Sequence, residues 1–400
     1  MTMTEKTIVY SSLGRDMHVF EVDTGSGALT PIQTFALPAD IQDAWANQAR
    51  TLLYVATSDA GPMSLVKRQA HFIQALKILP SGELAPHGEP MPLGNRPLSI
   101  TLDGAERHAL LAYSTPSNVT VHAIRPDGSV GDEVAQQPIQ FGSTVHQVRV
   151  TPAGNIVVTP ECGHHPTGEA AGAIGIYSYA AGRMAPLARI EADPARAAPW
   201  LGKKIGAHGF AARHVDFHPT RPWMYLCVER QGELHLYDCD DKGIAPRPRA
   251  IKSTLEGVTP GPSIQMAASI HVHPNGRFIY ITNRARDTEP VGDRQVFMGG
   301  VNDVAVFEID PDTGVPSLIQ HIDTQGNFPR TFGIDARGKV LVVGNQDHML
   351  VRTDGGIRKI LPGLAVFAIG GDGKLTLLNR MDHPDNGQVC FWTSVVTLGA

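Results

Sequence analysis

Apolar residues alternate with polar ones in a short segment that recurs along the whole chain. Between Asp303 and Ile322, the run through Val304, Val306 and Ile309 leads to a turn at Gly314 and then to a second apolar run. This pattern predicts a β-hairpin whose glycine adopts a positive φ. Seven glycines mark such turns, each followed within two positions by an apolar residue: Gly27, Gly82, Gly128, Gly182, Gly243, Gly314 and Gly373. The mean step between them is about 58 residues.

A short, fully apolar run precedes each of these hairpins and predicts a buried strand. The runs begin at Ile8, Leu52, Ala109, Ile156, Met224, Phe278 and Val340. Seven runs and seven hairpins indicate seven repeats built only of strands and turns. A repeat of this length is typical of a four-stranded propeller blade, so the predicted fold is an all-β, seven-bladed β-propeller with antiparallel blades.

The two ends of the sequence predict how this ring closes. The run at Ile8 begins so early that its blade lacks an innermost strand, whereas the apolar run 389–396 is left over at the other end. We expect the C-terminal run to pair into the N-terminal blade, which removes the exposed sheet edges. The continuous repeat also predicts a single domain over residues 1–400.

Composition narrows the function classes. The net charge is −5, which gives no indication of nucleic acid or an anionic membrane as a partner. No run is long and apolar enough to span a membrane, and the N-terminal residues lack a signal-peptide pattern. The four cysteines lie far apart, which favours free thiols in a cytoplasmic protein. We expect a monomer or homodimer that acts on a small molecule, without a cofactor.

Long connections recur at one place in the repeat, between the buried strand and its hairpin. They span 58–72, 159–173, 284–302 and 344–363. One face of the ring should therefore carry most of the large loops, where binding sites collect. A further long connection, 190–212, carries a set of residues that either overhangs a pocket or is simply solvated: Trp200, Lys203, Lys204 and His208.

Charged residues recur at equivalent positions where the scaffold needs no charge. The start of successive innermost strands holds His146, Arg213, Ala268 and Arg330. A second series, at the end of the next strand, holds Glu161, Glu229, Arg284 and Gln346. These groups should converge at one mouth of the central channel. They either pair with one another and rigidify the rim, or form an anion site whose arginines bind carboxylate or phosphate and whose His146 and Glu229 move protons.

Other motifs are less specific. The run 161–165 (Glu-Cys-Gly-His-His) resembles a set of metal ligands, but neighbouring histidines are poorly specific and the sequence favours a polar loop. His218, His271 and His273 alternate with apolar residues, as structural histidines in strands do. No Gly-x-Ser-x-Gly segment is present, so a serine nucleophile has no support.

Three segments carry a resemblance to a known family: 212–219, 270–284, and 328–335 with its continuation 344–347. The chain resembles the seven-bladed propeller lactonases, which include propeller-type 6-phosphogluconolactonases and the fungal carboxy-cis,cis-muconate cyclases. The resemblance implies a metal-free active site at the channel mouth with four catalytic residues: His146, Arg213, Glu229 and Arg284. Around it we expect six substrate-binding residues: Arg330, Gln346, Asn345, His271, Glu161 and His214.

The sequence departs from the family in three places. Ser269 replaces an acidic residue that usually precedes Ile270, and the connections 161–173 and 286–302 look enlarged. The substrate is therefore open: 6-phosphogluconolactone, or another lactone such as one from aromatic catabolism.

Four functions remain open on the sequence. The first is a lactonase that uses arginines to hold an anionic lactone and general acid/base catalysis to hydrolyse it. The second is a carboxymuconate-type cycloisomerase built from the same residues. The third is a propeller that only binds partners. A fourth, a calcium- or zinc-dependent lactonase, would need ligands such as Glu161, Glu229 and Asn345, but the axial arginines oppose a cation.

Overall fold

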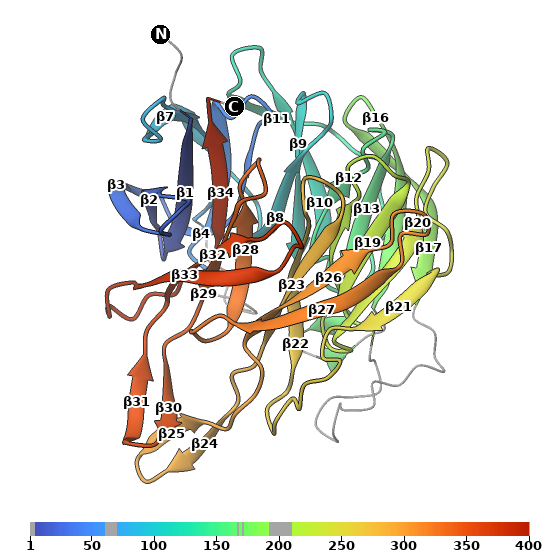
Figure 1. Ribbon diagram of the computed structural model, residues 1–400. Coiled ribbons are helices and arrows are strands. Elements are labelled where there is room, and N and C mark those ends of the chain that lie inside the picture. The colour runs from blue at the N-terminus through green and yellow to red at the C-terminus, as the bar shows by residue number, and fades with distance from the viewer. Residues whose placement is uncertain (1–4, 61–69, 166–167, 170–171, 192–209, 400) are drawn as a thin grey trace.

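The computed structural model describes residues 5–60, 70–165, 168–169, 172–191 and 210–399. These residues form seven four-stranded antiparallel sheets and three two-stranded ones, and they contain no helix. The sheets are arranged as blades around a central axis (Figure 1). The prediction of an all-β, seven-bladed β-propeller is thus confirmed.

Each blade contributes four strands. In the first blade these are β34 (Thr393–Leu398), β1 (Lys6–Leu13), β2 (Asp16–Val22) and β3 (Leu29–Ala36). In the second they are β4 (Asp40–Ala46), β5 (Leu52–Ser58), β6 (His71–Ile78) and β7 (Leu84–Pro92). In the third they are β8 (Pro97–Leu102), β9 (His108–Ser114), β10 (Ser117–Ile124) and β11 (Val130–Glu133). In the fourth they are β12 (Arg149–Val150), β13 (Ile156–Glu161), β16 (Ala173–Ala180) and β17 (Arg183–Glu191).

The remaining blades repeat this order. The fifth has β18 (Ala212–Phe217), β19 (Trp223–Val228), β20 (Glu233–Asp238) and β21 (Ala250–Ser253). The sixth has β22 (Met266–Val272), β23 (Phe278–Arg284), β26 (Asp303–Ile309) and β27 (Pro316–Asp323). The seventh has β28 (Pro329–Ile334), β29 (Val340–Asn345), β32 (Gly363–Ile369) and β33 (Leu375–Asp382).

The ring closes as the sequence predicted. Strand β34, near the C-terminus, pairs antiparallel with β1, with Val395 opposite Val9. The two strands lie side by side in Figure 1. The first blade is therefore assembled from both ends of the chain, and its sheet gains the innermost strand that its own N-terminal segment lacks.

The turn glycines connect one blade to the preceding one. Gly314 and Gly373 have φ values of 74° and 79°, which an L side chain rarely adopts. A Cβ on Gly373 would also lie 2.3 Å from the ring of Phe278. The carbonyl of the same glycine accepts a hydrogen bond from Tyr280 at 2.9 Å, as that of Gly314 does from Tyr225. The glycine thus allows both the tight turn and the close approach of two blades.

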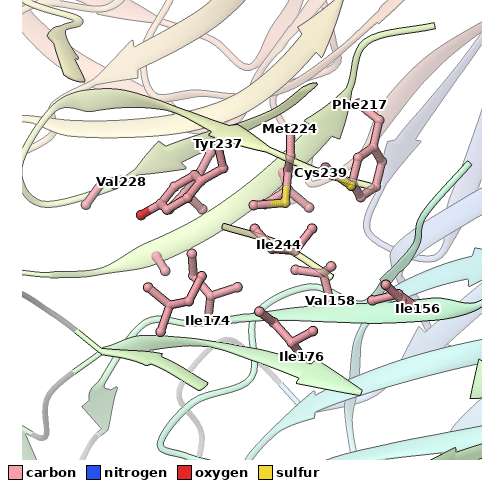
Figure 2. Close-up of a cluster of buried hydrophobic side chains, with 14 of the residues drawn as sticks. Ile156, Val158, Ile174, Ile176, Phe217, Met224, Val228, Tyr237, Cys239 and Ile244 are labelled. Carbon is pink, nitrogen blue, oxygen red and sulfur yellow. The ribbon is translucent and has the colours of Figure 1, made fainter. Parts of the chain in front are cut away.

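The core lies between the blades, because both faces of each sheet are covered by a neighbour. Seven clusters of buried apolar side chains each join two adjacent blades. Figure 2 shows the cluster between the fourth and fifth blades, where Val158 and Ile176 face Met224. Both strand faces are apolar for this reason, which explains the continuous apolar runs in the sequence.

Three accessory hairpins confirm that the long connections share one place in the repeat. They are β14 (His164–His165) with β15 (Gly168–Glu169), β24 (Thr288–Val291) with β25 (Arg294–Phe297), and β30 (Met349–Thr353) with β31 (Gly356–Ile360). Each leaves its blade between the second and third strands, and the latter two project together from the lower end of the view in Figure 1. Within the described chain there is no helix of the length and apolar character needed to cross a membrane.

Candidate active site

Equivalent backbone hydrogen bonds define the true register of the repeat. The turn before each second strand is closed by a bond from Thr151 to Ile156, from His218 to Trp223, from His273 to Phe278 and from Asp335 to Val340. Six residues after these acceptors stand Cys162, Glu229, Arg284 and Gln346. The predicted alignment of Glu161 with Glu229 is therefore wrong by one residue. In a strand, a shift of one residue places the side chain on the opposite face.

A pocket of about 220 Å³ lies where these equivalent positions converge. From the end of the second strands, or one or two residues beyond it, come Ser114, Thr115, Glu229, Arg230, Arg284, Arg286 and Gln346. From the entry to the innermost strands come Arg96, Leu98, Thr144, His146, Met266, Phe328 and Arg330. Five arginines thus face one carboxylate, which makes the pocket suited to an anion.

Glu229 lies at the centre of the charged groups. Its Oε1 accepts a hydrogen bond from Nη2 of Arg284 at 3.1 Å, and its Oε2 lies 3.1 Å from Nε of Arg213. Arg213 is fully buried and donates through Nη1 to the carbonyl of Ala268. The two guanidinium groups offset the charge of the buried carboxylate and fix its orientation.

Arg284 keeps part of its hydrogen-bonding capacity unused. Its Nε and Nη1 are buried and donate no hydrogen bond to any group in the described chain. Burial and the nearby charge of Arg213 lower its pKa to about 10, so the group remains protonated at neutral pH. A buried cation with free N–H groups is stabilised by an oxygen that carries negative charge.

Arg96 and Arg330 share the ring of Phe391. The Cζ atom of Arg330 lies 3.8 Å from the ring centroid, and that of Arg96 lies 5.8 Å from it. The hydrogen bonds of Arg96 go to the neutral groups Gln42 and the carbonyl of Ala60. Burial, together with Arg213 and Arg284, holds the pKa of Arg330 well below its usual value. An incoming anion would relieve this accumulation of positive charge.

A second aromatic ring lies between two other arginines. The ring centroid of Phe328 is 4.4 Å from Cζ of Arg284 and 4.6 Å from Cζ of Arg286. Phe328 has a φ of 56°, and Thr144, at the equivalent position three blades earlier, has a φ of 60°. Positive φ is costly for residues other than glycine and is concentrated at functional sites. The backbone is strained at two points of the pocket wall.

His146 approaches Glu229 from the neighbouring blade. One ligand-type atom each of His146, Cys162 and Glu229 lies within 4.8 Å of the others. These are groups that zinc accepts. However, both Glu229 oxygens are engaged by arginines, and burial raises the pKa of the Cys162 thiol well above its usual value. The donor set therefore fits a metal cation poorly, because positive charge already surrounds it.

Four predicted substrate-binding residues do not line the pocket. Glu161 binds Arg189 at 2.5 Å and the backbone N–H of Gly142 at 3.0 Å. Asn345 exchanges hydrogen bonds with Thr324, at 2.9 and 3.1 Å. These contacts turn both side chains toward the scaffold.

The other two of these four residues are His214, on the innermost strand β18, and His271, on the innermost strand β22. The ring of His214 lies 5.0 Å from that of His146. Burial, and then the positive charge of Arg213, hold the pKa of His214 well below the usual value. His271 lies 3.7 Å from Asp216, which also binds Arg149. By contrast Arg330 and Gln346, the other two predicted substrate-binding residues, do line the pocket.

Several sequence predictions fall outside the described residues. They concern Trp200, Lys203, Lys204 and His208, and also the side chains of His164 and His165.

Some pocket residues were absent from the sequence prediction. Extending the equivalent positions to all blades would have found Ser114, and moving two residues upstream of the first series would have found Arg96 and Phe328. Arg286 had no signal of this kind beyond its place in an enlarged connection.

Comparisons with known proteins agree with this architecture. A family model described as lactonase, 7-bladed β-propeller, matches residues 4–353. A relative named 6-phosphogluconolactonase from Bacillus subtilis is 23% identical, with 83% of this chain and 84% of the relative covered. One from Yersinia pestis is 26% identical, with 87% and 90% covered. The solved structure of the Pseudomonas aeruginosa periplasmic gluconolactonase PpgL superposes with a TM-score of 0.71 at 17% identity, covering 96% of this chain and 98% of that one.

Proposed function

The chain belongs to the seven-bladed β-propeller lactonase family, and from this membership and the pocket geometry we propose that it hydrolyses a small lactone carrying an anionic group. The single observation that carries the proposal is the placement of Glu229. Its carboxylate is held by Arg213 and Arg284 beside His146, while the buried Nε and Nη1 of Arg284 donate to no group in the described residues. Such a group is what a developing oxyanion requires.

The first step is the attack of water on the lactone carbonyl. His146 takes a proton from this water, because the Glu229 oxygens are already occupied by the two arginines. Arg284 donates to the carbonyl oxygen as it gains negative charge in the tetrahedral intermediate. Glu229 acts by holding both guanidinium groups in place.

The second step is collapse of the intermediate. The ring C–O bond breaks, and the leaving alkoxide takes the proton that His146 removed from water. The product is the open-chain hydroxy acid, and His146 returns to its neutral form. Atoms and charge balance without a metal ion, an oxidant or a cofactor.

The anionic group of the substrate is bound by Arg330 and Arg96. Both lie on Phe391, both line the pocket, and the described contacts of their guanidinium groups include no carboxylate. A planar guanidinium binds carboxylate or phosphate through two parallel N–H groups. The names of the relatives make 6-phosphogluconolactone the first substrate to test.

Hydrolysis is tested by running the reaction in ¹⁸O-labelled water with 6-phosphogluconolactone and with a carboxylated muconolactone. The proposal predicts one labelled oxygen in the carboxylate of the hydroxy acid. An unlabelled muconate with its conjugated ultraviolet absorbance would instead establish the cycloisomerase, which opens the ring by elimination. Loss of both reactions in a folded protein would point to a binding module.

A further inference from the structure

The pocket contains two units of the same construction, each with two arginines on one aromatic ring. The Phe391 unit consists of Arg96, Arg330 and Phe391. The Phe328 unit consists of Arg284, Arg286 and Phe328. Catalysis as proposed above uses one unit to hold an anion and Arg284 to stabilise the oxyanion. It leaves Arg286 without a role.

Arg286 is held at the rim by two neighbours rather than buried in the scaffold. Its Cζ lies 4.6 Å from the centre of the Phe328 ring, and its Nη1 lies 3.5 Å from Asp347. The side chain is 55% exposed, yet it lines the same pocket as Glu229 and Arg330. An aromatic face and one distant carboxylate fix the guanidinium while leaving most of its donors for a ligand.

Two accessory hairpins border the connection that carries Arg286. Strand β24 begins just after this residue, and Glu289 of β24 binds Arg352 of β30 at 2.5 Å. The hairpins come from the sixth and seventh blades and lie against each other in Figure 1. The ion pair and the Arg286–Asp347 contact therefore tie together the two connections that border this side of the pocket.

Charge favours a ligand with more than one anionic group. The described lining contains five arginines and a single carboxylate, and that carboxylate is engaged by Arg213 and Arg284. One anion bound to the Phe391 unit leaves the charge of Arg286, on the Phe328 ring, without an anionic ligand group. This positive charge adds to the local field, which a second anion would reduce.

We propose that Arg286 recognises a second anionic group, so that the substrate is a small dianionic lactone bound between the Phe391 unit and the Phe328 unit. That the ligand is a lactone rests on the proposed function. The site for a dianion rests on the geometry of the two units alone. Arg286 determines specificity and touches no reacting atom. Its replacement should therefore change binding of the second anion and leave the chemical step unchanged.

The test uses two probes of equal carbon number, adipate with two carboxylates and hexanoate with one. Calorimetry at low ionic strength measures their Kd values with the full-length protein and with Arg286→Ala. The wild type should bind adipate more tightly than hexanoate. Arg286→Ala should raise the Kd for adipate by about tenfold and change the Kd for hexanoate little. Arg286→Lys, which keeps the charge but not the planar group, should recover part of the loss.

Arg277→Ala is the matched control. Arg277 is 58% exposed and also lies over an aromatic ring, that of Phe278, but at the other end of strand β23. Its replacement removes the same charge and should change neither Kd. Equal effects of Arg277→Ala and Arg286→Ala on adipate would overturn the proposal, as would equal affinity of wild type for the two probes or binding of neither.

The same variants separate this proposal from the lactonase activity. If no lactone is hydrolysed but the preference for adipate over hexanoate depends on Arg286, the dianion site is supported and the proposed lactone hydrolysis is contradicted. If lactones are hydrolysed and Arg286→Ala raises KM equally for singly and doubly charged substrates, the reaction stands and the dianion site is wrong.

Discussion

Glu229 receives a hydrogen bond from Arg284 at 3.1 Å, and both side chains are almost completely buried. The two residues occupy equivalent positions on adjacent blades, at the ends of β19 and β23. A propeller repeat therefore brings together opposite charges that are far apart in the sequence. The pair is completed by Arg213, which binds the other oxygen of Glu229.

Replacement of Glu229 should lower activity sharply, and it should also cost stability because the charge between two buried arginines is lost. Glu229→Gln keeps the shape of the side chain but weakens its hold on Arg213 and Arg284. We expect kcat/KM to fall by at least ~100-fold, as for loss of a properly oriented catalytic group. Steady-state kinetics and circular dichroism check this prediction.

Glu161→Gln is the matched control, because Glu161 lies one residue before the equivalent position and binds Arg189 instead. This variant should retain near wild-type kcat and lose about 1–3 kcal/mol in the free energy of unfolding. If Glu161→Gln lost activity and Glu229→Gln retained it, the assignment of Glu229 rather than Glu161 to the site would be wrong.

The proton-transfer role can be assigned to one of two neighbouring histidines. His146 lines the pocket, whereas His214, whose ring is 5.0 Å away, does not. His146→Asn should lower kcat by ~10²–10⁴-fold, the range expected for a general base. His214→Asn should have a much smaller effect. A pH–rate profile that keeps its acidic limb in His146→Asn would show that another group takes the proton from water.

Metal removal should leave the activity unchanged. His146, Cys162 and Glu229 are close enough to hold an ion, but two arginines compete for Glu229 and the thiol stays protonated at neutral pH. Activity after dialysis against EDTA should equal that of the untreated enzyme, and Cys162→Ser should keep most of it. Inactivation by EDTA that added zinc reverses would replace the proposed mechanism with a metal-dependent one.

Stability should depend on pH through Asp43. Burial raises the pKa of this carboxyl to about 6, although hydrogen bonds from the backbone of Ile100 and Ala44 and the charge of Arg330 oppose the shift. The folded state therefore binds this proton more tightly than the unfolded state does. The stabilisation is fully present below the ordinary Asp pKa and is lost as pH rises through about 6.

Urea unfolding of wild type and Asp43→Asn between pH 4 and pH 8 isolates this contribution. The wild type should lose stability relative to the variant as pH increases, because only the wild type has a carboxyl to deprotonate. A difference that is constant with pH, or of the opposite sign, would contradict the assignment.

Much of the fold was predictable because each repeat has the same local pattern of apolar runs and turn glycines. Six of the seven turn glycines have a φ between 73° and 93° and a side chain of the preceding blade within 2.6 Å of where a Cβ would lie, so glycine recurs at these turns. Gly243 is the exception, with a φ of 159° and no atom within 4 Å. The four residues that the resemblance implied to be catalytic lie together for a similar reason: the start of one strand and the end of the next meet at the channel mouth in each blade.

Other features of the site depend on information that the local sequence lacks. Residues Ile156, Val157 and Val158 are apolar on both strand faces, so alternation could not fix the register, and Glu161 was aligned in place of Cys162. The approach of Arg286 to Phe328 depends on a positive φ at a phenylalanine and on the packing of two hairpins from different blades. These are tertiary relationships with no periodic signal.

Two lactones that differ by one anionic group test directly whether the pocket hydrolyses an anionic lactone. Hydrolysis of 6-phosphogluconolactone and of plain gluconolactone is followed by acid release in a pH-stat, with Arg330→Ala measured beside wild type. An anion site at Arg330 predicts a much higher kcat/KM for the phosphorylated lactone and loss of that preference in Arg330→Ala. Equal rates for both lactones, with the preference unchanged in the variant, would contradict it.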